Sequence, residues 1–214
     1  MDSIMKTKID IDTWNRKEVF NFFKDFNEPF YGLTVDIDCT IAYDFCKKNN
    51  ISFFLFYLHR SLLAANKIEN FKYRIIGGEV YVYDKVNASP TINRPNGTFG
   101  FSYMSYHQEF SEFEKEAKLE IERVQATNTL IPATSGENVI HYSSIPWIKF
   151  TSLSHARHFE FEDSCPKITF GKMTDRGSKK EMPMSVHAHH ALLDGSHIGQ
   201  YIDLFQEFLN NTSI

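Results

Sequence analysis

Apolar residues recur at intervals of three and four along five stretches of the chain, a spacing that predicts helices with one buried face. The first predicted helix covers Trp14–Phe26, with Thr13 placed to cap its first turn. A short helix is expected around Ile41–Lys48. Three longer helices are predicted over Phe53–Asn66, Gln108–Ala126 and Gly195–Asn210.

Alternation of apolar and polar residues, which is typical of strands, separates these helices. Gly32–Cys39 alternates in this way and predicts one strand. Tyr73–Asp84 predicts a hairpin that turns at Gly77 and Gly78, because two glycines suit a tight turn with positive φ. Residues 90–106 predict a second hairpin, with Asn96 and Gly97 in its turn.

The C-terminal half shows the same mixture of patterns. Residues 138–153 predict two strand segments broken by Pro146, and the segments 167–174 and 181–190 predict a third hairpin. Helical and strand patterns alternate without a repeat or an interdomain linker. The predicted fold class is therefore α/β, with a mixed β-sheet and helices packed on it in two layers, in a single domain over residues 1–214.

Composition narrows the possible functions. The net charge of the 214 residues is −4, and no basic stripe is present, which argues against a nucleic-acid partner. The longest apolar-rich stretch contains His59 and Arg60 and is too short to cross a membrane. Cys39, Cys46 and Cys165 show no CxxC spacing, so we expect reduced thiols and a cytoplasmic location.

Four of the nine histidines fall within "SVHAHHALLDGSH", residues 185–197. One interpretation is a metal site made from His187, His189, His190 and His197, but no zinc-type spacing is present. A second is a buried strand whose imidazoles are merely hydrogen-bonded. A third is a general base at a strand end, with one ring nitrogen held and the other facing a cleft. We expect no metal.

Further segments of the sequence favour the third interpretation, a general base. "HHALLDGSH" closely resembles the HHxxxDG signature of the chloramphenicol acetyltransferases. "TWNRKEVFNFF", "YSSIPWIKF" and "KITFGKM" resemble three further segments of that family, in the same order and at similar spacing. The resemblance covers nearly the whole chain and implies a CoA-dependent acyltransferase-like fold.

The resemblance also implies roles for individual residues. His190, the second histidine of the motif, is implied as the general base, and Ser143 as the donor that stabilises the tetrahedral oxyanion. Asp194 is implied to pair with Arg16 in a structural ion pair, and Thr169 to act through an ordered water. Ser144 would point to the opposite face of a strand, because side chains alternate.

The same resemblance implies where the two substrates bind. Lys172 is implied to lie near the coenzyme phosphates. The acceptor pocket of the family is aromatic and apolar, and the matching positions are Phe22, Phe23, Tyr31, Phe99, Leu130 and Ile131. The segment after Pro146 and Trp147 departs from the family pattern, which leaves the acceptor open.

The leading hypothesis is an O-acetyltransferase that moves an acetyl group from acetyl-CoA, a co-substrate, to a hydroxyl of chloramphenicol or a similar small molecule. No permanently bound cofactor is expected. The resemblance implies a homotrimer with active sites at subunit interfaces. The alternatives are the same mechanism with another acceptor or acyl group, a binding protein that has lost turnover, and a metal-binding protein.

Overall fold

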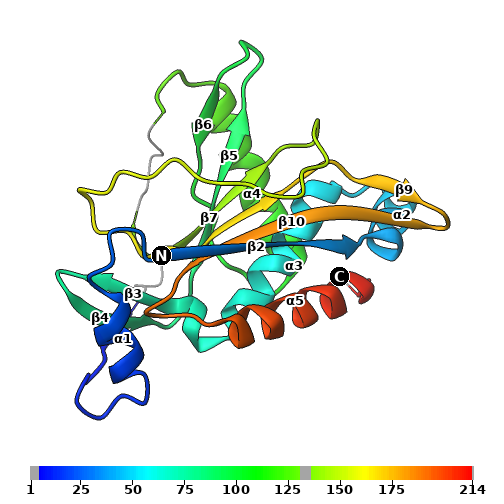
Figure 1. Ribbon diagram of the computed structural model, residues 1–214. Helices are drawn as coiled ribbons and strands as arrows, with labels where there is room; N and C mark the ends of the chain where they lie inside the picture. Colours follow the sequence, from blue (N-terminus) through cyan, green and yellow to red (C-terminus); the bar gives the residue numbers. More distant parts are fainter. Residues whose placement is uncertain (1–4, 131–135, 214) are drawn as a thin grey trace.

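The computed structural model describes residues 5–130 and 136–213. The chain builds one large sheet, one small sheet and a set of helices (Figure 1). The α-helices are α1 (Lys17–Phe23), α2 (Thr40–Asn49), α3 (Phe53–Lys67), α4 (Phe110–Gln125) and α5 (Gly195–Asn210), with a 3-10 turn at Glu69–Lys72. The small sheet has the order β1-β4-β3, with β1 (Lys6–Lys8), β3 (Tyr73–Ile76) and β4 (Glu79–Tyr83).

The large sheet is mixed and has the order β2-β10-β8-β7-β5-β6, with β9 paired to the far end of β10. Its strands are β2 (Phe30–Asp38), β5 (Asn87–Asn93), β6 (Phe99–Phe101), β7 (Val139–Ser144), β8 (Lys167–Phe170), β9 (Thr174–Arg176) and β10 (Lys179–His189). The neighbours β5, β7 and β8 run parallel, and the other pairs are antiparallel. The mixed α/β sheet with helices packed on it is the predicted class.

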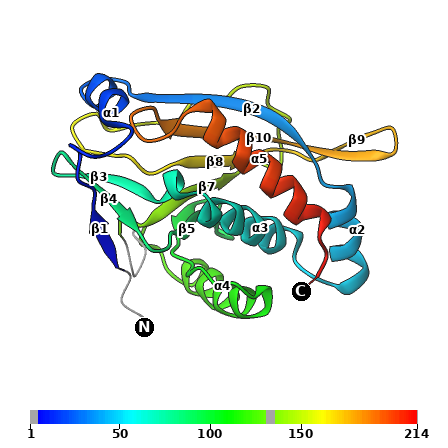
Figure 2. The ribbon, with the colours of Figure 1, turned by 90° about the horizontal axis from the view of Figure 1, so that it is seen from below.

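One face of the large sheet is apolar and packs on helices α3 and α5 (Figure 2). Phe170 of β8 contacts Tyr57 of α3 and Phe205 of α5, with ring centroids 4.7 and 5.7 Å apart. Helix α3 is buried along most of its length, as its composition predicts. The apolar side chains of β7, β8 and β10 therefore anchor the sheet, and their alternating neighbours point to the other face.

The three predicted hairpins are present. Gly77 and Gly78 have φ of +60° and +78° in the turn between β3 and β4, and Gly97 has φ of +82° between β5 and β6. Strands β8 and β10 pair antiparallel, and the short strand β9 and Gly177 form the turn between them. Positive φ at these positions is the reason that glycine occupies them.

Two local predictions are wrong. Helix α1 begins at Lys17 and ends at Phe23, so it is shorter than Trp14–Phe26. Thr13 caps nothing in the helix, because its hydroxyl donates to Asp10 in a preceding turn. The second strand expected after Pro146 is absent, and residues 145–166 instead cross the polar face of the large sheet as an irregular segment. Strand β7 already has partners on both edges, so the segment that follows it cannot pair with it.

No helix among the described residues is long and apolar enough to cross a membrane. The three cysteines, all buried, form no disulfide in the described part of the chain.

Two buried and two half-buried histidines make the fold sensitive to acid. Desolvation lowers the pKa of His59, His141, His155 and His189 to about 4 each, against about 6.5 in an unfolded chain. The unfolded chain therefore binds more protons between these two values, and stability falls as the pH drops from about 6.5 to about 4. For the fully buried His59 the loss is on the order of 3 kcal/mol.

We expect urea unfolding at about pH 5 to give a clearly smaller free energy of unfolding than at about pH 7.5. His59→Phe should reduce the difference between the two pH values, whereas His158→Phe, at an exposed position, should leave it unchanged. Equal free energies of unfolding at both pH values would contradict the assignment of these histidines as buried and neutral.

Candidate active site

A two-bond ion pair joins the start of α1 to the turn before α5. Nη1 and Nη2 of Arg16 donate to Oδ2 and Oδ1 of Asp194 at 2.6 and 3.0 Å. The hydrogen bonds from Arg16 hold the pKa of Asp194 below its usual value, so the carboxylate stays charged. Arg16 is nearly buried, and its Nη2 also donates to the backbone carbonyl of His190 at 3.4 Å. This arrangement ties the first helix to the turn that carries His190.

The His190 imidazole lies between two aromatic rings from the N-terminal part of the chain. Phe23 stacks on it with centroids 4.1 Å apart and an interplanar angle of 7°, and Tyr31 lies at 4.5 Å. Its Nδ1 atom is buried and lies 3.5 Å from Oδ1 of Asp194. About a third of the His190 side chain is exposed, so the ring is held on three sides and open on one.

The other histidines of the cluster have structural surroundings. His189 is buried, and its Nδ1 accepts a hydrogen bond from the backbone of Ala191. Nδ1 of His197 accepts from the backbone of Asp194, and this contact completes a capping box at the start of α5. The ring of His187 fills the space above Gly32, where an added Cβ would lie 2.3 Å from it. Of the four, His190 is the one whose ring stacks on Phe23 and stays about a third exposed.

The Arg16–Asp194 pair allows a direct test of coupling. Asp194→Asn should lower thermal stability and any activity of this site together, because it leaves the Arg16 charge nearly buried and unpaired. Arg16→Ala should lower stability and activity in the same way. The double variant should lose less free energy of unfolding than the two single variants together, by about 1–3 kcal/mol. Strict additivity in denaturant unfolding would mean that the two side chains do not stabilise each other.

Ser143 lies on the polar face of the large sheet, beside Thr169. The two residues are directly paired where β7 and β8 run parallel, and Ser185 of β10 continues the row. The Thr169 hydroxyl is buried and has no hydrogen-bond partner among the described residues. Two hydroxyls thus lie side by side, and that of Thr169 is buried.

Ser144 points to the helical side of the sheet. Its hydroxyl lies 2.9 Å from the hydroxyl of Tyr57 on α3. The alternation expected for β7 is therefore present, and the side chains of the two adjacent serines point to opposite faces of the sheet.

Within one chain, His190 and Ser143 lie far apart. Ser185 is in register with Thr169, and Thr169 with Ser143, whereas His190 follows Ser185 by five positions, just past the end of β10. At ~3.3 Å per residue this is roughly 16 Å along the strands, in addition to two strand spacings of ~4.8 Å. One thioester carbonyl cannot lie beside both side chains of the same chain.

Positions assigned to the acceptor pocket fall into two groups. Phe23 and Tyr31 surround His190, and Phe22 packs on Phe23 but is 65% exposed. Phe99 lines a pocket of about 420 Å³ together with Ser143. Leu130 is 48% exposed and accepts a backbone hydrogen bond from Phe101. Ile131 lies outside the described residues.

Lys172 is exposed just after β8. Its backbone N–H donates to the carbonyl of Ile148 at 2.9 Å, which fixes the position of the irregular segment over the sheet. Its ammonium has no carboxylate partner among the ion pairs of the described chain.

The pocket beside Ser143 also contains residues that the sequence did not single out. His141 and Lys167 line it from β7 and β8, and His155 from the irregular segment. His141 precedes Ser143 by two positions and Lys167 precedes Thr169 by two. Strand alternation alone could therefore have placed His141 and Lys167 on the same face. No sequence signal locates His155.

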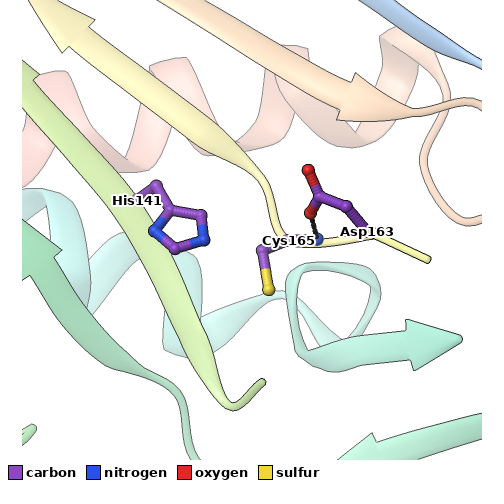
Figure 3. Close-up of side chains that lie close together, drawn as sticks. All are labelled: His141, Asp163 and Cys165. Carbon is purple, nitrogen blue, oxygen red and sulfur yellow. Dashed lines mark hydrogen bonds between the residues drawn. The ribbon is translucent and has the colours of Figure 1, made fainter. Parts of the chain in front are cut away.

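One group of side chains has the composition of a metal site (Figure 3). His141, Asp163 and Cys165 each offer a ligand atom, and these atoms lie within 4.8 Å of one another. The Lys167 ammonium already occupies Oδ2 of Asp163 at 2.5 Å, and the Cys165 thiol donates to the carbonyl of Glu137. Burial also raises the pKa of this thiol. The group is charge-balanced by Lys167, so its donor set does not fit a cation.

Comparison with curated proteins gives full-length relatives. The family described as chloramphenicol acetyltransferase matches residues 4–206. A chloramphenicol acetyltransferase of Proteus mirabilis is 30% identical over 203 residues, which cover 94% of this chain and 93% of that protein. One of Staphylococcus aureus is 28% identical over 204 residues, 94% of each chain.

Solved structures agree with the sequence relatives. A chloramphenicol acetyltransferase superposes with a TM-score of 0.85 at 32% identity, covering 96% of this chain and 100% of that one. A dihydrolipoamide acetyltransferase of Azotobacter vinelandii shares the fold, with a TM-score of 0.63 at 14% identity over 91% of this chain and 86% of that one. The family match over nearly the whole chain, with a relative at 30% identity, shows that this chain belongs to the chloramphenicol acetyltransferase family and is an acyltransferase.

Proposed function

We propose that the protein transfers the acetyl group of acetyl-CoA to a hydroxyl of a small molecule. The observation that carries this proposal is the setting of His190, which is held between Phe23 and Tyr31 on a turn locked by Arg16 and Asp194. A hydroxyl is a weak nucleophile at neutral pH, and an oriented imidazole is a suitable base for it. Chloramphenicol is the first acceptor to test, because the family is named after this substrate.

In the proposed reaction His190 Nε2 takes the hydroxyl proton while the oxygen attacks the thioester carbonyl. The Nδ1 atom faces the Asp194 carboxylate, which leaves Nε2 for the substrate. The carbonyl oxygen becomes an oxyanion that accepts a hydrogen bond from Ser143. When the tetrahedral intermediate collapses, the carbon–sulfur bond breaks, and the CoA thiolate takes the proton from the imidazolium. Both substrates bind together, so no acyl-enzyme is required.

Thr169 and Lys172 complete the proposed machinery. The unpartnered Thr169 hydroxyl, next to Ser143, is placed to hold a water against the intermediate. Lys172 is exposed just after β8, and we propose that its ammonium attracts the coenzyme phosphates. The acetyl donor is a co-substrate, and we propose no permanently bound cofactor.

The separation of His190 from Ser143 within one chain implies that each active site uses two subunits. We propose a homotrimer in which His190 of one subunit faces Ser143 of its neighbour. Strands β2 and β6 support this arrangement, because each pairs with one other strand in the described chain and so leaves a sheet edge open. We place the enzyme in the cytoplasm, where its three reduced cysteines would persist.

The test is release of CoA thiol from acetyl-CoA in the presence of chloramphenicol and of other hydroxyl compounds. Acceptor-dependent release supports the proposal. Release with other acceptors but none with chloramphenicol supports the same mechanism with a different acceptor. No release with any acceptor or acyl-CoA, from a folded protein, would favour a binding protein that has lost turnover.

A further inference from the structure

The turn between β10 and α5, which carries His190, is buried and needs hydrogen-bond donors from elsewhere. The side chains that follow His190 in it, Ala191, Leu192 and Leu193, have no exposed surface. The backbone N–H groups of Leu192 and Leu193 both donate to the carbonyl of His189, at 2.9 and 3.0 Å. These donors are thus bound within the turn itself, whereas its carbonyls depend on other parts of the chain.

Two side chains from outside the turn donate to its carbonyls. Nη2 of Arg16 reaches the carbonyl of His190 at 3.4 Å, and Nδ2 of Asn70 reaches that of Leu192 at 2.8 Å. Among the hydrogen bonds of the described residues, no other side chain donates to the carbonyls of residues 190–193. The bond from Asn70 is the shorter of the two, and it joins residues that lie 122 positions apart in the sequence.

The backbone at Asn70 is itself firmly held. Asn70 lies in the 3-10 turn Glu69–Lys72, directly after helix α3. The next residue, Phe71, is fully buried and packs on Tyr201 of α5, with ring centroids 4.9 Å apart. The carbonyl of Asn70 accepts a hydrogen bond from the backbone of Tyr73. The amide of Asn70 is therefore presented to the turn from a packed part of the core.

Loss of the Asn70 bond would affect the position of His190. Because Leu192 has no exposed surface, its carbonyl has no route to water if the amide is removed. An unpaired buried carbonyl costs about 1–3 kcal/mol, so the turn is expected to move until the carbonyl finds another donor. His190 lies two residues earlier, with its ring between Phe23 and Tyr31. A displacement of ~1 Å at a reacting group can lower catalysis by about 10²-fold.

We propose that Asn70 is a positioning residue of the active site, whose amide holds the Leu192 carbonyl and so keeps the His190 ring in place between Phe23 and Tyr31. This inference rests on the proposed role of His190 as the general base. Asn70 acts through the backbone of the turn and not on a substrate.

Asn70→Asp is the sharpest test, because it keeps the shape of the side chain and replaces a donating amide by a carboxylate that only accepts. The carboxylate would face the Leu192 carbonyl, so the turn must move. We expect kcat for acetyl transfer to fall about tenfold or more, with the Michaelis constants of acetyl-CoA and the acceptor within about twofold of the wild type. Asn70→Ala should act in the same direction, and it serves as the test if the aspartate variant does not fold.

Asn66→Asp is the matched control. It makes the same exchange one turn earlier, on α3, where the Asn66 amide donates to the carbonyls of Leu62 and Val86 at 2.9 Å each. Neither carbonyl belongs to the turn that carries His190. The control should therefore lower thermal stability and leave kcat per folded molecule unchanged. An equal loss of kcat in the control would show that general destabilisation, and not the position of His190, explains the effect.

Proton NMR of the His190 ring separates this inference from the proposed reaction. The Cε1 proton of His190 is identified by its loss in His190→Ala, and stacking on Phe23 shifts its signal upfield. The signal should move downfield in Asn70→Asp and Asn70→Ala but not in Asn66→Asp. If the wild type releases no CoA thiol with any acceptor or acyl-CoA, acetyl transfer fails as the function, and the NMR signal alone decides the role of Asn70. An unmoved His190 signal, or a wild-type kcat in a folded, active Asn70 variant, would overturn the proposal.

Discussion

Replacing His190 by alanine is expected to lower the turnover of acetyl transfer by about 10²–10⁴-fold, the usual contribution of a positioned general base. The imidazole is already oriented by Phe23, Tyr31 and the nearby Asp194 carboxylate, so no other group can take its place without moving these contacts. The fold should persist, because Arg16 and Asp194 stay paired at the turn. Steady-state thiol release, with circular dichroism as a check of folding, measures both effects.

His189→Ala is the control for this prediction. His189 is buried at the end of β10, so its loss should lower stability and leave the turnover per folded molecule within a few-fold of the wild type. An active His190→Ala variant beside an inactive His189→Ala variant would show that the base has been assigned to the wrong histidine.

Replacing Ser143 by alanine is expected to lower turnover by about 10²–10³-fold while the Michaelis constants change little. The hydroxyl matters only when charge develops on the thioester oxygen, so its loss weakens the transition state more than the bound substrates. Ser144→Ala is the matched control. It removes the hydrogen bond to Tyr57 on the helical side of the sheet and should lower stability by about 1 kcal/mol with nearly normal turnover. Equal and small kinetic effects in both variants would rule out the oxyanion role.

These two variants also test whether an active site is shared between subunits. If His190 and Ser143 of different subunits meet, a mixed oligomer of His190→Ala and Ser143→Ala chains contains some sites with both residues intact. Co-expression of the two inactive chains should therefore recover a substantial fraction of wild-type activity. Each variant expressed alone should stay inactive. Failure of a purified mixed oligomer to regain activity would mean that the two residues do not act in one shared site.

Secondary-structure elements that depend on short sequence patterns were predictable from the sequence. Paired glycines at positions 77 and 78 predicted the tight turn that the structure contains, and apolar spacing predicted helix α3. Arg16 and Asp194 were matched through family motifs and lie in contact, although 178 residues separate them. Motif resemblance supplied that long-range information, since no local pattern contains it.

Other features depend on what covers a surface, which a local pattern cannot show. Residues 147–153 have the composition of a strand, but the edges of β7 are occupied, so they cross the polar face instead. His155 comes to the Ser143 pocket on that irregular segment, where no periodicity predicts its direction. The first helix begins later than its apolar spacing suggests, because Asp10–Trp14 form a turn before it.

The pairing of β2 with β10 has a consequence for the synthesis of the protein. Nine residue pairs join residues 30–38 to residues 181–189. Strand β2 therefore cannot pair with β10 until nearly the whole chain has been synthesised. While the ribosome makes the intervening residues, Phe23 and Tyr31 lack the His190 ring that they contact in the finished fold. Closing so long a loop is slow, and unpaired apolar strands invite aggregation during the delay. We therefore expect the emerging N-terminal half to be a chaperone client until its last strand and helix have been translated.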